Sequence, residues 1–194
     1  MNKKEYRLKE VRAVEDEERM IVEGYAVVYD SPTNMGGWIE VVENGALDGA
    51  DLDDVCMKYN HEDTYLIMAR TRNKSLQLTV DKKGLKVRAE LIDTQSNRDI
   101  YKAIQSQLLD KMSFAFIVED ANWDTVDGVD IRRIKKISKL FDVSVVDIPA
   151  YESTDIYARS NDAVEEEREQ YRAEKEAKEK LELEKQKLLL KLSL

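Results

Sequence analysis

The chain has 194 residues, 42% of them hydrophobic and 37% charged, with 40 acidic against 31 basic side chains. This length allows one domain of roughly 100–200 residues plus an appendage. The formal net charge of −9 argues against a protein that grips nucleic acid through its phosphates, because such binding needs a basic surface. A single cysteine excludes an internal disulfide, and with a single histidine it cannot complete a structural zinc site.

The sequence shows no pattern typical of a membrane span or a secretory signal. No apolar run approaches the roughly 18 residues of a membrane span. The lysines near the N-terminus have no apolar segment behind them, so this end does not look like a secretory signal. We therefore expect a soluble protein that is intracellular where it is made, with no membrane partner and no nucleic-acid partner.

The composition changes at about residue 160. All seven glycines and both prolines precede residue 150, whereas residues 162–194 are dense in helix formers and in charged pairs such as Glu174 with Lys178. Leucines return at the end, with Leu188 and Leu192 at helical spacing. We predict a domain over residues 1–160 and a charged helical or disordered tail over 161–194. The tail is either a solvated helix or a tethering helix whose leucine end docks on a partner.

The first half of the domain shows clear period-two patterning. Residues 20–28 are predicted to form a largely buried strand, and residues 75–91 a hairpin that turns at 81–84. Residues 97–109 change to helical spacing, with Ser96 as the expected cap. The apolar face of that helix would hold Ile100, Ile104 and Leu108.

The second half returns to strands. Residues 112–118 are predicted as a strand, Asp127-Gly128 as a hairpin turn, and residues 139–148 as a strand that Pro149 stops. This makes about seven strands and one internal helix. The predicted fold class is α+β, mostly β and barrel-like, followed by a C-terminal charged helix.

The only histidine of the chain, His61, lies where the predicted strand at residues 55–59 runs into a polar loop. Imidazole is the usual general base near neutral pH, because its unperturbed pKa is about 6.5. Any histidine-dependent mechanism of this chain must therefore use His61. The alternative is an incidental loop histidine.

Ser113 interrupts an apolar strand. Met112, Phe114 and Phe116 share one face, so Ser113 points to the opposite face at the start of the strand, from which a nucleophile can meet a cleft. A serine hydroxyl needs a base to accept its proton, and this requires His61 within hydrogen-bonding distance. A serine in this position is otherwise structural.

Asp142 lies inside the very apolar predicted strand at residues 139–148. A buried acidic group without a partner costs on the order of several kcal/mol, so Asp142 should have a partner or face a wet cleft. A carboxylate bonded to the second nitrogen of a histidine fixes its tautomer and stabilises the imidazolium. Ser144 shares the face of Asp142 and is a lesser candidate for supporting the site. The alternative is an aspartate at a sheet edge or paired with a nearby lysine.

His61, Ser113 and Asp142 together could fill the three roles of a serine hydrolase. The sequence then becomes recognisable, because five segments in this order resemble the prohead (capsid-maturation) serine proteases of tailed bacteriophages, from about Tyr6 to Tyr157. The segments are the acidic-apolar run 40–47, Asn60-His61-Glu62, residues 76–78 with the turn 81–85, Met112 to Phe116, and Asp142 to Val146 with Pro149-Ala150-Tyr151.

This resemblance implies a fold like the herpesvirus assemblins, which is a β-barrel flanked by helices. It implies a serine endopeptidase that needs no cofactor or metal and acts inside the immature capsid, in the host cytoplasm. Its substrates would be the scaffold and the major capsid protein, and it would commonly cut itself. The portal and a second copy of the chain are further partners that the resemblance allows. The tail would be a tether to scaffold or capsid, or a segment released by self-cleavage.

Carried over residue by residue, the resemblance makes Ser113 the nucleophile, His61 the base and Asp142 the third member. Relatives more often carry glutamate at that third position, and aspartate is one methylene shorter. The oxyanion donors are expected to be backbone N–H groups, with Arg132 and Arg133 as the basic side chains considered.

Two other classes of protein compete with this interpretation. If the chain is a non-catalytic capsid-assembly or scaffold protein, His61, Ser113 and Asp142 have no catalytic role. Ser113 would then not react with serine-directed reagents. A metal-dependent nuclease could bind Mg²⁺ through Asp81, Glu90 and Asp93, but the acidity of the chain and its lack of a basic stripe disfavour that class.

Overall fold

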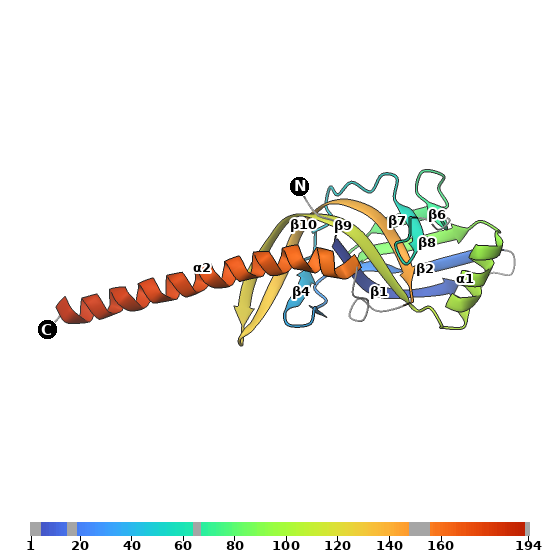
Figure 1. The fold of residues 1–194 in the computed structure, drawn as a ribbon. Coiled ribbons are helices and arrows are strands. Elements are labelled where there is room, and N and C mark those ends of the chain that lie inside the picture. The colour runs from blue at the N-terminus through green and yellow to red at the C-terminus, as the bar shows by residue number, and fades with distance from the viewer. Residues whose placement is uncertain (1–4, 15–18, 64–66, 148–155, 193–194) are drawn as a thin grey trace.

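The computed structural model describes residues 5–14, 19–63, 67–147 and 156–192. The two helices in these ranges lie at opposite ends of a large curved sheet, and the C-terminal one projects far beyond it (Figure 1). The strands are β1 (Glu5–Val14), β2 (Met20–Val28), β3 (Thr33–Asn34), β4 (Ile39–Val42), β5 (Cys56–Tyr59), β6 (Ala69–Arg70), β7 (Leu76–Val80), β8 (Gly84–Leu91), β9 (Lys111–Val126) and β10 (Val129–Val146). The helices are α1 (Gln95–Gln105) and α2 (Ile156–Leu192).

Within the described residues, the strands form one ten-stranded mixed sheet in the order β3-β4-β10-β9-β1-β2-β8-β7, with β5 paired to β10 and β6. The long strand β10 pairs in parallel with β4 through its first half and with β5 through its second half. Its other edge pairs antiparallel with β9. The expected α+β, mostly β class with a C-terminal helix is confirmed. The assemblin-like barrel is not, because no ladder in the described ranges joins β7 to β6 and closes the sheet.

The strand and hairpin predicted in the first half of the domain are confirmed. Leu85 and Val87 of β8 are fully buried, as the alternation requires. Asp81 stabilises the turn by accepting hydrogen bonds from the backbone N–H groups of Lys83 (2.8 Å) and Gly84 (3.1 Å). Gly84 has a φ of +148°, and a Cβ there would lie 2.1 Å from the Val27 carbonyl oxygen. Only glycine fits where β8 approaches the backbone of its neighbour β2 so closely.

Helix α1 begins two residues earlier than predicted, and its cap is Thr94 instead of Ser96. The Thr94 hydroxyl accepts from the Asn97 N–H at 3.2 Å, which satisfies one of the open donors of the first turn. Ile100 and Ile104 are buried as expected, but Leu108 is 77% exposed. The helix has ended before Leu108 is reached, so helical spacing no longer decides where that side chain points.

The hairpin of β9 and β10 is much longer than predicted, although its turn at Asp127-Gly128 is where the sequence indicated it. Its outer half, residues 119–136, is a protruding arm, which we call the β-arm. Polar residues such as Asp120, Asn122 and Asp124 alternate with half-buried ones there. The strand signal is weak because neither face of the β-arm is fully apolar. Pro149 lies outside the described residues.

Helix α2 packs its first described side chains on the β-arm and on the segment before β4. Val164 is buried, and Glu165 accepts a 2.8 Å hydrogen bond from the Trp38 indole. Arg168 and Arg172 each donate to one carboxylate oxygen of the buried Asp130, both at 2.7 Å. Residues 164–172 are therefore attached to the domain.

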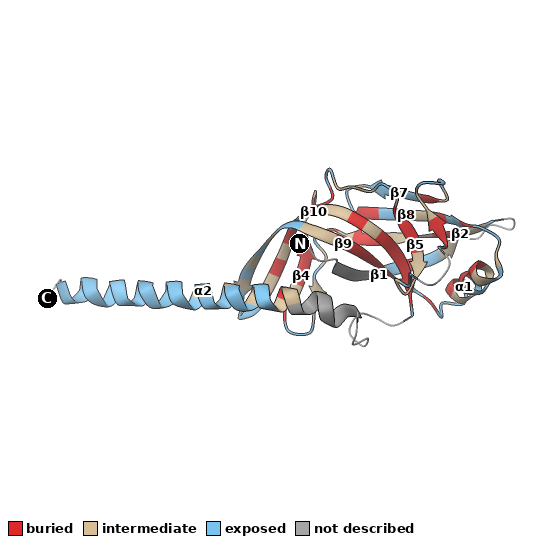
Figure 2. Cartoon of the chain, turned by 45° about the horizontal axis from the view of Figure 1, so that its top comes forward, coloured by how far each residue is buried: buried red, intermediate tan, exposed pale blue. Residues whose placement is uncertain are grey.

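The distal part of α2 differs in its exposure. Residues 176–192 are all exposed, including the leucines near the end (Figure 2). Within the described ranges, no helix combines the length and apolar character needed to span a bilayer.

Candidate active site

Three neighbouring strands bring the predicted site residues to one face of the sheet. In the pairing of β10 with β5, Ser144 lies beside Lys58, and in the pairing of β10 with β9 it lies beside Ser113. Residues paired directly across strands point to the same face of a sheet. Lys58, Ser144 and Ser113 therefore form one row across the three strands, and Asp142 precedes Ser144 by one period of β10.

His61 reaches this row through a tight turn at the end of β5. The Glu62 N–H donates to the Tyr59 carbonyl at 3.0 Å, and Asn60 and His61 have φ values of 50° and 57°. Positive φ at both central residues is the signature of a type I′ turn, and Asn and His tolerate it better than most residues. The Asn60 N–H donates to the Val145 carbonyl of β10 at 2.9 Å. This bond holds the turn against the end of β10.

The imidazole of His61 contacts the carboxylate of Asp142. His61 Nδ1 lies 2.5 Å from Asp142 Oδ1, and the two side chains are only 4% and 2% exposed. The Ser144 hydroxyl donates to the same carboxylate oxygen at 2.9 Å and lies 3.1 Å from His61 Nδ1. Because the carboxylate is an acceptor, Nδ1 carries the proton and Nε2 is the basic nitrogen.

The environment of Asp142 keeps its carboxylate ionised. Burial by itself raises the pKa of Asp142, but the hydrogen bond and charge of His61, the charge of Lys58 and the Ser144 hydroxyl together hold that pKa below its ordinary value. Lys58 Nζ lies 3.8 Å from Asp142 Oδ2. Asp142 therefore pairs with both the histidine and a nearby lysine. These are two of the arrangements that the sequence left open, beside a wet cleft and a sheet edge.

Ser113 is fully buried. It lies between Leu8 of β1 and Ser144 of β10 in the ladder, one strand away from the pair of His61 and Asp142. Both faces of this part of β9 are covered, so Ser113 has no exposed surface in this structure, and the cleft stays a prediction. Ser113 lies near the start of its strand, as predicted, and this strand, β9, is central in the sheet.

The family model of the caudovirus prohead serine proteases matches residues 7–169. The chain belongs to this family. It is therefore a serine protease of bacteriophage capsid maturation. The matched range contains His61, Ser113 and Asp142, and it continues past residue 160 into the attached part of α2.

One solved structure similar to this prohead protease is the bacteriophage T4 capsid assembly protease gp21. The likeness has a TM-score of 0.47 at 12% sequence identity, and it covers 76% of this chain and 100% of that chain. No curated protein matches the chain.

The arginines considered as oxyanion donors lie elsewhere in this prohead protease. Arg132 contacts Glu40 at 3.2 Å and Glu167 of α2 at 3.1 Å, near the start of β10. Ser144 follows twelve residues later on the same strand, and a strand rises about 3.3 Å per residue. The suggestion that Arg132 and the neighbouring Arg133 serve the site was therefore wrong.

The acidic residues that a metal-dependent nuclease would use each bind a different partner in the structure. Asp81 accepts from the Tyr25 hydroxyl, and Asp93 pairs with Arg98. Among the residues that the structure describes, no group of three or more His, Cys, Asp or Glu side chains could hold a metal ion.

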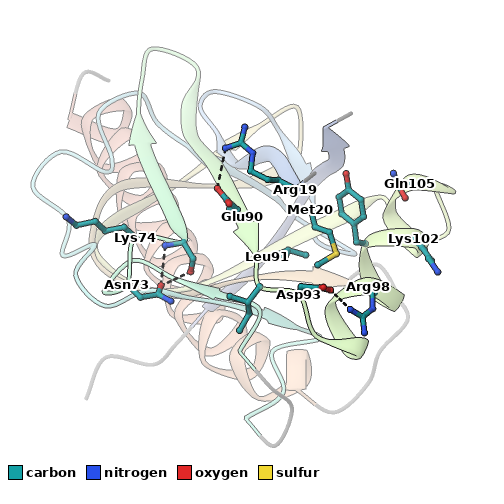
Figure 3. A pocket seen from close by; sticks show the side chains of 13 residues that line it. Arg19, Met20, Asn73, Lys74, Glu90, Leu91, Asp93, Arg98, Lys102 and Gln105 are labelled. Carbon is teal, nitrogen blue, oxygen red and sulfur yellow. Dashed lines mark hydrogen bonds and ion pairs between the residues drawn. The ribbon is translucent and has the colours of Figure 1, made fainter. Parts of the chain in front are cut away.

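A pocket of about 870 Å³ is lined by the start of β2, the segment before β7, the end of β8 and α1 (Figure 3). None of His61, Ser113 and Asp142 lines it. Its charged groups are largely paired with one another, as in Arg19 with Glu90 at 3.7 Å. The volume of this pocket therefore says nothing about where the chemistry occurs.

The lowered pKa of Asp142 predicts a pH dependence of stability. A carboxylate with a lowered pKa contributes stability above its unfolded pKa, about 3.9, and loses it as the pH falls through the folded pKa. We expect Asp142→Asn to lower the free energy of unfolding by roughly 1.5–3 kcal/mol above pH 5, the range for hydrogen bonds to charged groups. The difference from wild type should shrink below about pH 4. Urea unfolding from pH 3 to 6 measures it, and an equal difference at both ends would contradict the ionised pair.

Proposed function

We propose that this prohead protease is an endopeptidase that cuts the scaffold and the major capsid protein, and also itself, with Ser113 as nucleophile, His61 as general base and Asp142 as the orienting carboxylate. The observation that carries the proposal is the 2.5 Å contact between His61 Nδ1 and Asp142 on the strand next to Ser113. Family membership supplies the reaction class, and the buried pair supplies the base that a serine nucleophile requires.

In the proposed mechanism, Asp142 holds the proton on Nδ1, so that Nε2 can accept the proton of Ser113 Oγ. The hydroxyl oxygen attacks the scissile carbonyl, and the charged Asp142 stabilises the imidazolium that forms. His61 then gives the proton to the leaving amine, and a water activated by His61 Nε2 hydrolyses the acyl-enzyme. Backbone N–H groups are proposed as the oxyanion donors.

The distal part of α2 is proposed as a tether to scaffold or portal, or as a segment released by self-cleavage. What supports this is the exposure of Leu188, Leu189, Leu190 and Leu192, which are 62% to 77% exposed at the end of a charged helix. Exposed apolar side chains gathered on one segment often mark an interaction site. A homodimer stays a prediction from the resemblance to assemblins.

Co-expression with the phage's major capsid protein and scaffold tests the proposed function. Assembled shells would be purified, treated with a serine-directed fluorophosphonate and analysed by intact and peptide mass spectrometry. We expect shortened capsid or scaffold protein and one adduct on Ser113. Assembled shells with full-length proteins and no adduct would instead favour the non-catalytic assembly protein.

A further inference from the structure

Lys58 contacts two carboxylates near His61, those of Asp63 and Asp142. Its Nζ is 2.6 Å from Asp63 Oδ1 and 3.8 Å from Asp142 Oδ2, and its side chain is only 14% exposed. Asp63 follows His61 by two residues, and Asp142 is the carboxylate that His61 contacts. One ammonium group therefore connects the segment that carries the histidine with the strand that orients it.

The two oxygens of Asp142 have different partners. Oδ1 receives His61 Nδ1 and the Ser144 hydroxyl, whereas the partner of Oδ2 is Lys58. A carboxylate held at both oxygens cannot rotate freely about its χ2 angle, so the direction of Oδ1 toward His61 is maintained. The positive charge also favours the ionised carboxylate, which burial alone would disfavour.

The contact between Lys58 and Asp63 stabilises the backbone of the turn that carries His61. Asn60 and His61 both have positive φ, which is an unfavourable conformation for residues other than glycine. Such conformations persist when the surroundings over-determine them. The pair of Lys58 and Asp63 closes the turn from β5 to the residue two beyond His61, in addition to the bond from the Asn60 N–H to β10.

We propose that Lys58 is a positioning residue of the active site, which fixes Oδ2 of Asp142 and the turn that carries His61. This inference rests on the proposed function of His61 and Asp142. Lys58 acts through these two side chains and is not assigned a contact with substrate. The sequence offered only a weak signal for it, a lysine three residues before the single histidine in a mostly apolar strand.

Nuclear magnetic resonance of the full-length chain tests the proposal without a substrate. Because His61 is the only histidine, the ¹⁵N-coupled signal of its hydrogen-bonded Nδ1 proton has no competitor from another imidazole. We expect a slowly exchanging, downfield Nδ1 proton in wild type, loss of that signal in Lys58→Met, and its return in Lys58→Arg, which keeps the charge. Lys136→Met removes a 2.7 Å ion pair with Glu119 on the β-arm and serves as the matched control.

The same variants would be compared in the co-expression assay by the rate at which full-length capsid and scaffold protein disappear. We expect a fall of roughly 10- to 100-fold for Lys58→Met, the loss typical of a misplaced catalytic group. Lys58→Arg should recover to within about threefold of wild type, because the guanidinium can reach both carboxylates, and Lys136→Met should cleave as wild type does. A wild-type Nδ1 signal and wild-type cleavage in Lys58→Met would overturn the proposal. If wild type itself fails to cleave, the proposed function fails, and the Nδ1 signal still decides the role of Lys58.

Discussion

Ser113→Ala is expected to abolish cleavage of the capsid and scaffold proteins. The variant lacks the only hydroxyl proposed to attack the scissile carbonyl, and His61 then has no nucleophile to activate. Removing the nucleophile of a serine protease lowers turnover by roughly 10⁶-fold, which lies below detection in shells analysed by intact mass. Alanine is slightly smaller than serine and is apolar, so the buried position in β9 should still fold.

Two further serine variants make this result specific. Ser138 lies on β10 outside the site, so the Ser138→Ala variant should cleave as wild type does. Ser144→Ala should slow cleavage without abolishing it, because Ser144 supports Asp142 and His61 Nδ1. Full activity in Ser113→Ala together with no activity in Ser144→Ala would instead identify Ser144 as the nucleophile.

A chain that ends at residue 161 is expected to lose a large part of its stability, whereas one that ends at residue 175 should keep it. The shorter chain lacks Arg168 and Arg172, so the carboxylate of Asp130, only 4% exposed, loses both ion pairs. Removing the partners of a buried charge costs about 3–5 kcal/mol. That is a large part of the roughly 5–15 kcal/mol that stabilises a domain. Urea unfolding followed by circular dichroism measures the difference between the two chains.

The double variant Arg168→Ala/Arg172→Ala in the full-length chain separates the ion pairs from the length of the helix. It should lose a large share of the stability that the shorter chain loses, and Asp130→Asn should restore part of it by removing the buried charge. Equal stability of the two truncated chains would show that α2 is an appendage from its first turn, as the predicted boundary at residue 160 supposes.

Local patterns were enough to predict several elements. The alternation of Leu85, Val87 and Ala89 indicated β8, and Asp127-Gly128 indicated the turn between β9 and β10. These signals depend only on the period of the backbone and on turn chemistry, which neighbouring residues in the chain determine. The cap of α1 was assigned to the wrong residue, because Thr94 and Ser96 are both good caps and the choice between them depends on where the preceding strand ends.

The candidate site shows a similar division. Composition singled out His61, and an acidic residue inside an apolar strand singled out Asp142; the contact between them then depends on the tertiary structure. The roles of these residues, and that of Ser113, stay predictions until the variants are measured. Lys58 and the burial of Ser113 were not foreseen, because nothing near them in the sequence shows which strands flank β5 and β9.

The sequence by itself thus determined the mostly β class, a charged tail rich in helix formers and the residue types available for chemistry. Only the tertiary structure decided which of those residues meet. Asp142 and His61 are 81 positions apart, and they come together because β5 pairs in parallel with β10 in one register. A shift of that register by one residue would turn Asp142 to the other face of the sheet. The register depends on packing along the whole of β10, and no local pattern of residues encodes it.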